Sequence, residues 1–482
     1  KTMAIDNLQR TDLPLTVTEA AAALRAGETT SVGLTAAMIA RADILDPMTG
    51  TYVTRFDDYA MAQAEQADED FANGIDKGTY QGIPIGVKDI LAMAEGPTTA
   101  NSLILDRAWG AGKDGPVVAR LKAAGAVITG KLTTSEFAIG SPDASKPFAI
   151  PKNPWNLERS PGGSSAGTGN GIASGLVFAG IGTDTGGSIR IPAAWNGVTG
   201  LMPTFGRVPK SGCVPLGYSL DHIGPLARSA RDCAAMLAVI AGYHPSDESC
   251  VDRPVDDYVG ALTGDLSGMR IGVELTNHFP EQSDPALRGC FDAAIATLAD
   301  LGADIVEVTL PLYDEVTTAL WVMMAAEALA YHHNDLTTKW EDYYALSRAN
   351  ISRGALSSGS DYVQAARVRR VAQEKLAATL ETVDLVATPT SAIGALTHEG
   401  MLQRRMGNIM KMVFTGYWDA VGNPALALPM GFTDDGLPLS LQLGARPFEE
   451  GTALKAGDAY QTRTDWHLQL PGILTESMAG AS

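Results

Sequence analysis

The spacing of hydrophobic positions changes repeatedly along the chain and predicts helices that alternate with short strands. Apolar residues recur at helical spacing within 114–125, 229–242 and 287–302, and a glycine ends each of these segments. Short apolar runs predict buried strands at 83–89, 126–129, 176–181, 269–273, 304–308, 384–387, 425–429 and 437–443. This alternation predicts an α/β fold with a large mixed, mostly parallel twisted β-sheet covered by helices on both faces.

These segments are expected to form one domain over residues 1–482. Its catalytic core is expected at about 75–242, and its C-terminal strands and closing helix at about 421–467. Residues 244–268 are rich in Asp, Pro and Gly, whereas much of 314–420 is helical in pattern. We expect these two segments to form a variable linker and lid region.

Composition narrows the class of protein. Hydrophobic residues make up 45% of the chain, and 51 glycines indicate a globular protein with many tight turns. The formal net charge is −19 without a dense Lys/Arg cluster, which argues against nucleic-acid binding through the protein's own surface. There is no run of 18 apolar residues and no signal-peptide pattern, so we expect no membrane association and a cytoplasmic location.

The four cysteines, Cys213, Cys233, Cys250 and Cys290, are widely spaced and form no CxxC pair. They are expected to be free thiols in a reducing compartment, although spacing alone does not exclude a disulfide.

Two motifs suggest phosphate or metal chemistry but are incomplete. Gly125–Lys131 reads G-x-x-x-x-G-K, yet Leu132 stands where a magnesium-binding Ser or Thr belongs, and an apolar strand falls inside the motif. His332 and His333 are neighbours and point in different directions on a helix. We therefore expect no metal and no cofactor.

A third motif leaves an alternative open. Gly163–Gly167 reads G-x-S-x-G, which is typical of an α/β-hydrolase-type esterase with Ser165 as nucleophile. That mechanism needs a downstream histidine, for which His398 and His467 are available. Neither histidine lies in a glycine-flanked loop, and no strand of five apolar residues precedes Ser165.

The stretch from Pro161 to Pro192 carries the strongest chemical signal. Two Gly-Gly-Ser turns, Gly162–Ser164 and Gly186–Ser188, flank one short strand. Glycine admits positive φ and lets backbone N–H groups approach a ligand closely. Two such turns can present hydroxyl and bare N–H groups to a single cavity, as needed to attack a carbonyl and stabilise the resulting oxyanion.

Lys88 follows an apolar strand well upstream of this stretch. A lysine delivered from the end of a buried strand loses solvation of its charged form, and its pKa falls toward the range of a usable base. The alternative is a lysine that reaches the surface or pairs with Asp89, and the residues alone leave this open.

Together these residues resemble the amidase signature family. The resemblance rests first on Lys88-Asp89 and on the two serine-containing turns. It extends over roughly residues 15 to 467 through further landmarks at 131–137, 153–156, 200–204, 221–225, 423–425 and 436–442.

The resemblance implies a Ser–Ser–Lys mechanism. Ser188 is the implied nucleophile, Ser164 is the bridging serine after a cis peptide bond, and Lys88 is the base. A neutral lysine can accept a proton from Ser164 while Ser164 accepts one from Ser188, and the same relay can return a proton to the departing nitrogen. The implied oxyanion donors are the backbone N–H groups of Thr185, Gly186, Gly187 and Ser188. The residues expected only to support the turn are Ser165, Thr183, Asp184 and Arg190.

The family also contains the amidase subunit of the tRNA-dependent glutamine amidotransferase, which grips glutamine with an arginine and an aspartate. Arg367 or Arg369 can match the arginine, but Lys411-Met412 stands where the aspartate is expected. This amidotransferase component is therefore the alternative to a general amidase.

Methionine and aromatic residues predict an adaptable apolar substrate wall. Met406, Met410 and Phe414 have the spacing of one helix face, although ordinary core packing explains it equally well. The residues expected to form the pocket are Trp321, Met324, Met410, Phe414 and Tyr417. Those expected in the core instead are Trp155, Trp195 and Phe205.

We therefore expect a small-molecule substrate. It is a bulky, largely uncharged amide, anilide or aryl carbamate, with ester hydrolysis as a side reaction. The sequence leaves a homodimer open.

Overall fold

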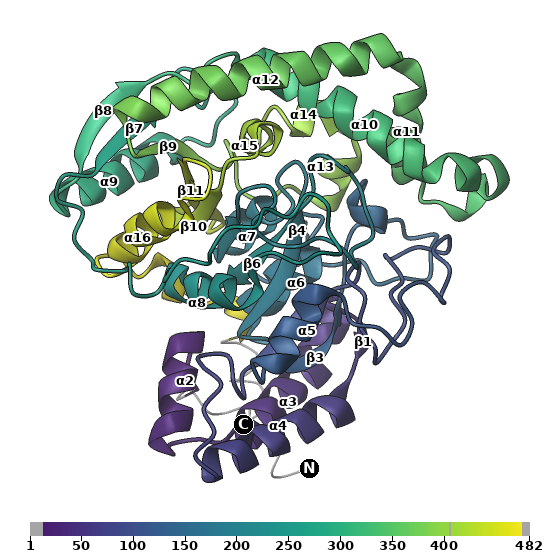
Figure 1. Ribbon diagram of the computed structural model, residues 1–482, viewed down its shortest axis with the longest axis vertical. Helices are drawn as coiled ribbons and strands as arrows, with labels where there is room; N and C mark the ends of the chain where they lie inside the picture. Colours follow the sequence, from purple (N-terminus) through teal and green to yellow (C-terminus); the bar gives the residue numbers. More distant parts are fainter. Residues whose placement is uncertain (1–12, 404–405, 475–482) are drawn as a thin grey trace.

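The computed structural model describes residues 13–403 and 406–474, which build one continuous β-sheet with its helices (Figure 1). The strands are β1 (Tyr52–Arg55), β2 (Pro84–Lys88), β3 (Val127–Leu132), β4 (Ala179–Asp184), β5 (Thr199–Met202), β6 (His222–Ala227), β7 (Arg270–Glu274), β8 (Asp304–Val308), β9 (Leu385–Pro389), β10 (Ala425–Phe432) and β11 (Pro438–Ala445). Within the described ranges, these eleven strands lie in the order β1-β3-β2-β4-β6-β5-β10-β11-β9-β7-β8.

The sheet is mixed, as predicted, but parallel pairing is confined to its flanks. On one flank β2 pairs with β3 and β4, and on the other β7 pairs with β8 and β9. The remaining neighbouring pairs are antiparallel. The expectation of a mostly parallel sheet is wrong in this detail, because β1, β5, β6, β10 and β11 are antiparallel to all their neighbours in the described sheet. The hydrophobic pattern along the chain does not show the direction in which a strand enters the sheet.

The helices match the predicted alternation with strands. They are α2 (Val17–Ala26), α3 (Ser31–Thr49), α4 (Asp57–Ala72), α5 (Pro116–Ala123), α6 (Ala166–Ala173), α7 (Arg190–Asn196), α8 (Ala230–Ile240), α9 (Leu287–Asp300), α10 (Tyr313–Thr338), α11 (Ala345–Ser352), α12 (Gly359–Thr382), α13 (His398–Gln403), α14 (Met406–Ile409), α15 (Gly416–Val421) and α16 (Glu450–Gln461).

Helices cover both faces of the sheet, as the contacts of two adjacent residues of β5 show. A Cβ atom at Gly200 would contact Ala193 of α7, whereas the hydroxyl group of the adjacent Thr199 accepts a hydrogen bond from Gln461 of α16. Because consecutive strand residues point to opposite faces, α7 and α16 lie on opposite sides of the sheet. α6 packs beside α7, and α8 packs beside α16.

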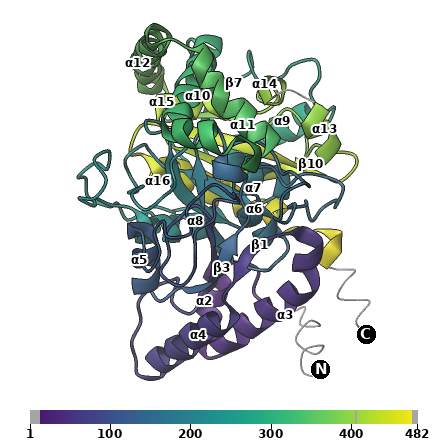
Figure 2. The ribbon, with the colours of Figure 1, turned by 90° about the vertical axis from the view of Figure 1, so that its right-hand side faces the viewer.

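The two ends of the molecule are helical. α3 and α4 pack together at one end, and α10 and α12 pack together at the other (Figure 2). Within the described ranges, no helix combines the length and the apolar character needed to cross a membrane. The four cysteines are free thiols.

Candidate active site

The candidate site lies at the carboxyl ends of β2 and β4. Lys88 is the last residue of β2, and Thr183 and Asp184 end the neighbouring parallel strand β4. Parallel pairing brings the two strand ends to the same edge of the sheet. The Ser164 turn precedes α6, and the Ser188 turn connects β4 to α7.

Lys88 is fully buried and contacts three hydroxyl groups. Its Nζ lies 2.7 Å from Ser164 Oγ, 2.7 Å from Thr183 Oγ1 and 3.0 Å from Ser165 Oγ. Burial lowers the pKa of Lys88 to about 7, because the charged form loses its hydration and no carboxylate binds it directly. Hydroxyl groups can donate as well as accept, so this environment also suits an uncharged amine. The lysine reaches neither the surface nor Asp89.

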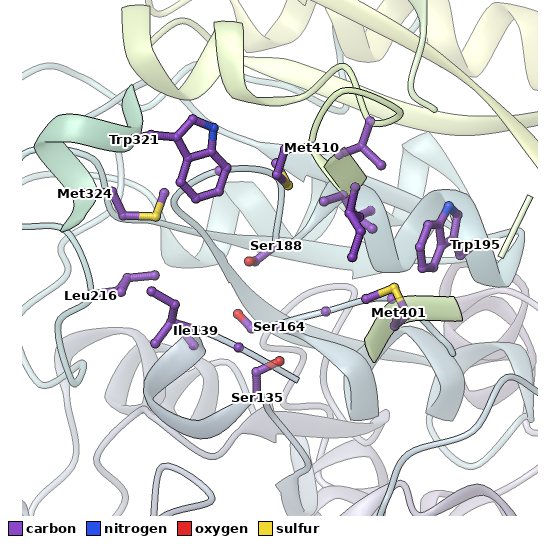
Figure 3. A pocket seen from close by; sticks show the side chains of 18 residues that line it. Ser135, Ile139, Ser164, Ser188, Trp195, Leu216, Trp321, Met324, Met401 and Met410 are labelled. Atoms are coloured by element: carbon purple, nitrogen blue, oxygen red, sulfur yellow. The ribbon is translucent and has the colours of Figure 1, made fainter. Parts of the chain in front are cut away.

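Ser164 and Ser188 meet in one cavity. The peptide bond between Gly163 and Ser164 is cis, as the resemblance implies. Both serines line a cavity of about 90 Å³, and Figure 3 shows their hydroxyl groups facing it. The geometry thus brings together Lys88, Ser164 and Ser188.

Ser165 has a different environment. It is fully buried and is absent from the cavity lining. Its hydroxyl group donates to the Thr183 carbonyl at 3.2 Å and accepts from the Thr183 N–H and from Lys88. Neither His398 nor His467 bonds to it in the described part of the chain. This geometry favours a supporting role for Ser165 over that of the nucleophile in the esterase alternative.

The Ser188 turn is held by Asp184. Its carboxylate accepts the N–H groups of Gly187 at 2.5 Å and Ile189 at 3.1 Å. The Gly187 N–H is therefore occupied, which departs from its expected role as an oxyanion donor. Within this turn, the N–H groups of Thr185, Gly186 and Ser188 form no hydrogen bond to a described residue.

Arg190 connects the turn to α15 and β11. Its guanidinium group pairs with Asp184 at 3.0 Å and with Asp419 of α15 at 2.6 Å, and it donates to Gln442 of β11 at 2.8 Å. Burial opposes ionisation of Asp184, but the Arg190 charge and hydrogen bonds hold the pKa of this carboxyl group below its ordinary value. Asp184 and Arg190 thus support the turn, as expected.

The cavity beside the two serines is apolar. Its lining contains three of the five predicted pocket residues, namely Trp321, Met324 and Met410 (Figure 3). None of the described lining residues carries a charge; the further members are Ser135, Ala138, Ile139, Gly140, Gly162, Gly163, Gly186, Ile191, Trp195, Leu216, Met401, Ile409 and Val413.

The other two predicted pocket residues, Phe414 and Tyr417, do not line the cavity. Phe414 packs edge-on against His278, and Tyr417 stacks on Tyr313, so both belong to the core. The expected shared helix face fails because α14 ends at Ile409. The Met406 side chain lies outside the described residues.

One residue expected in the core lines the cavity instead. Trp195 of α7 forms part of the wall although it is only 1% exposed. Trp155 and Phe205 do not line the cavity, as expected. Most other wall residues were missed at the sequence level, because they come from loops and helices far apart in the chain.

The residues considered for a glutamine clamp lie elsewhere. Arg367 is exposed on α12, and Arg369 donates to Ser219 Oγ at 3.2 Å. Lys411 is exposed, whereas Met412 is buried in a cluster with Ala392.

The incomplete motifs have structural roles. The segment 125–131 contains most of β3, and its Lys131 pairs with Asp89 at 3.4 Å. His332 is buried against the Tyr343 hydroxyl group at 2.9 Å. No group of three or more His, Cys, Asp or Glu side chains suited to a metal ion occurs in the part of the chain that the structure describes.

Comparison with known proteins identifies the family. The family model described as Amidase matches residues 33–454. The chain belongs to the amidase family. Its fold is that of amidase signature enzymes.

Curated members of the amidase family are similar over nearly the whole chain. The A subunit of glutamyl-tRNA(Gln) amidotransferase from Roseiflexus sp. (strain RS-1) is 40% identical over 96% of this chain and 99% of its own. The protein of the same name from Geobacter metallireducens is 38% identical over 95% and 99%.

Solved structures show the same fold. A complex described as revealing the evolutionary origins of an s-triazine catabolic enzyme gives a TM-score of 0.86 at 32% identity, covering 93% of this chain and 98% of that one. A peptide amidase from Stenotrophomonas maltophilia gives 0.81 at 28% identity, covering 93% and 96%. Relatives described in different terms therefore share this fold.

Proposed function

We propose that the protein is an amidase that hydrolyses the C–N bond of a bulky, largely uncharged amide, anilide or aryl carbamate. The observation that carries this proposal is the apolar cavity beside Ser188, whose described lining has no charged side chain. An apolar wall with few polar groups suits an uncharged substrate and offers nothing to balance a free ammonium and carboxylate.

Ser188 is the proposed nucleophile. It attacks the substrate carbonyl while its proton passes to Ser164, and the Ser164 proton passes to the neutral amine of Lys88, 2.7 Å away. The oxyanion accepts hydrogen bonds from the free N–H groups of the Thr185–Ser188 turn. Lys88 then returns a proton through Ser164 to the departing nitrogen, because an amine leaves only when protonated. Water hydrolyses the acyl-enzyme by the same relay, and esters should react as a side activity.

The second candidate is the amidase subunit of a glutamine-dependent tRNA amidotransferase. The curated relatives favour it, since several at about 40% identity carry that name. This candidate requires a partner chain, because the acidic surface of this protein is unsuited to tRNA. The apolar cavity argues against this candidate, because its described lining has no charged side chain to balance the ammonium and carboxylate groups of glutamine.

A substrate panel tests the two candidates. We expect the purified protein to release aromatic amines from acyl anilides and N-aryl carbamates faster than ammonia from glutamine, and Ser188→Ala to abolish both activities. Faster ammonia release from glutamine, or activity only with partner subunits, would establish the amidotransferase.

A further inference from the structure

A third serine lines the cavity beside the two serines of the proposed mechanism. The described lining carries three side-chain hydroxyl groups, which belong to Ser135, Ser164 and Ser188. In the view of Figure 3, Ser164 lies between Ser135 and Ser188. The proposed relay uses Ser164 and Ser188 and gives Ser135 no part.

The Ser135 hydroxyl group is available to a substrate. Among the described residues, Ser135 forms hydrogen bonds only through its backbone: its N–H donates to the Ser164 carbonyl at 3.2 Å, and its own carbonyl accepts from the Thr134 hydroxyl group at 3.1 Å. The residue is only 8% exposed, yet its Oγ is not sealed inside the protein and retains accessible surface at the cavity that it lines. Most buried polar groups are hydrogen-bonded, so an unpaired hydroxyl group at a substrate cavity indicates a contact with the substrate.

Gly163 leaves this hydroxyl group uncovered. Its φ is not positive, so its φ does not require glycine there. A Cβ atom at position 163 would lie 3.0 Å from Ser135 Oγ, which is closer than an ordinary van der Waals contact. The Ser135 oxygen therefore lies directly against the residue that precedes Ser164, beside the proposed proton relay.

The departing nitrogen of the substrate must also lie beside Ser164, because Ser164 delivers its proton. A secondary amide nitrogen already carries one hydrogen. When the carbonyl carbon becomes tetrahedral, this nitrogen becomes pyramidal, its lone pair turns toward the Ser164 proton, and its N–H bond points elsewhere. A serine hydroxyl group can accept a hydrogen bond, so an oxygen next to Ser164 can bind this N–H in the transition state.

We propose that Ser135 Oγ accepts the N–H of the scissile amide and so makes the site selective for amides over esters. An ester has no such hydrogen, and a site built to bind an N–H discriminates against an analogue that lacks it. This inference rests on the proposed amidase function and narrows its substrates to amides, anilides and carbamates whose nitrogen carries a hydrogen.

Three substrates with the same acyl group test this contact: an anilide, its N-methyl derivative and the phenyl ester. The measurement is kcat/KM for the unaltered protein and for Ser135→Ala. We expect the variant to lose about tenfold with the anilide and less than about twofold with the other two, since only the anilide can form the lost hydrogen bond. Met401→Leu is the matched control, because it changes an apolar residue of the same cavity and should alter all three rates by similar factors.

The outcomes separate this contact from the proposed function. Equal losses for all three substrates in Ser135→Ala, or an unchanged anilide rate, would refute the contact and leave the amidase assignment intact. If glutamine is hydrolysed faster than every anilide, the proposed function fails, and glutamine is then compared with its γ-methyl ester. A loss confined to glutamine in Ser135→Ala would support the contact, whereas equal losses would refute it. A protein that hydrolyses none of these substrates would refute both proposals.

Discussion

Two buried lysines show how neighbouring atoms decide the role of a residue. Lys88 and Lys131 are both fully buried, and burial lowers the pKa of each. Lys131 faces the Asp89 carboxylate, which favours its charged form, whereas Lys88 binds only hydroxyl groups. The same residue type therefore serves as a structural cation at one position and is suited to act as a base at the other.

The first prediction concerns the pH dependence of hydrolysis. Below a pKa of about 7, Lys88 is protonated and cannot accept the Ser164 proton, so kcat/KM should fall about tenfold per pH unit. Above that value the amine is neutral and the rate should level off. A pH–rate profile of anilide hydrolysis measures this, and Lys88→Arg, which stays charged, should be inactive at every pH. A profile flat from about pH 5 to pH 8 would falsify the assignment of Lys88 as the base.

At the scale of elements, the turn between β4 and α7 is held by hydrogen bonds inside the turn and by a hydrogen bond from a residue outside it. Asp184 binds N–H groups inside the turn, and Thr415 just before α15 donates to the Gly186 carbonyl at 2.7 Å. Gly187 has φ +127°, and a Cβ atom there would lie 2.1 Å from Thr415 Oγ1. Glycine is thus required by both backbone conformation and space.

The second prediction follows from this crowding. Gly187→Ala should displace the turn and lower kcat by about 100-fold or more, as expected when an oxyanion donor is lost. Gly289→Ala is the matched control, because that position in α9 has ordinary φ and open space around it. The control should keep full activity and a slightly raised Tm. Equal kcat values for the two variants would show that the turn tolerates a side chain.

The third prediction concerns the charge network behind the turn. Arg190→Met leaves the buried Asp184 and Asp419 carboxyl groups without their cation, which should cost about 3–5 kcal/mol of folding stability. Arg288→Met removes an exposed ion pair with Asp292 and should change stability by less than about 1 kcal/mol. Urea unfolding of both variants provides the comparison, and similar losses would contradict a dominant role for the buried network.

At the scale of the whole molecule, single side chains join segments that are far apart in sequence. Asp232 of α8 accepts the backbone N–H groups of Val17 and Thr18 and the Thr18 hydroxyl group. These bonds satisfy donors at the first turn of α2, which have no partner within the helix. α2 is thereby fixed to α8 in the helical layer that covers the sheet.

The fourth prediction is that Asp232→Ala frees the start of α2 and leaves the active site intact. Hydrogen exchange over residues 17–26 should accelerate, with a stability loss of about 1–3 kcal/mol and kcat unchanged. Asp265→Ala, which removes an exposed aspartate bonded only to its neighbour Ser267, should change neither exchange nor stability. Unchanged exchange in Asp232→Ala would refute the tether.

Some predicted elements match the structure, whereas other strands were missed. The missed strands have short or unfavourable local sequences. The strand predicted at 304–308 coincides with β8, and the helical segment predicted within 229–242 contains α8. β5 and β6 were not recognised as strands because β5 has four residues and β6 contains Gly224 and Pro225, which have low strand propensity. Their hydrogen-bonding neighbours supply the stability that their own sequences lack.

Four features follow from the amino-acid sequence alone: the alternation of helices and strands, the two serine turns, the lysine at the end of a buried strand, and the family. These features depend on local periodicity and on motifs of adjacent residues. Three others become visible only in the folded protein: the antiparallel centre of the sheet, the occupied N–H group of Gly187 and the apolar lining of the cavity at Ser188. These arise where segments such as α7, α10 and the residues around Met410 converge, and such long-range contacts leave no periodic signal along the chain.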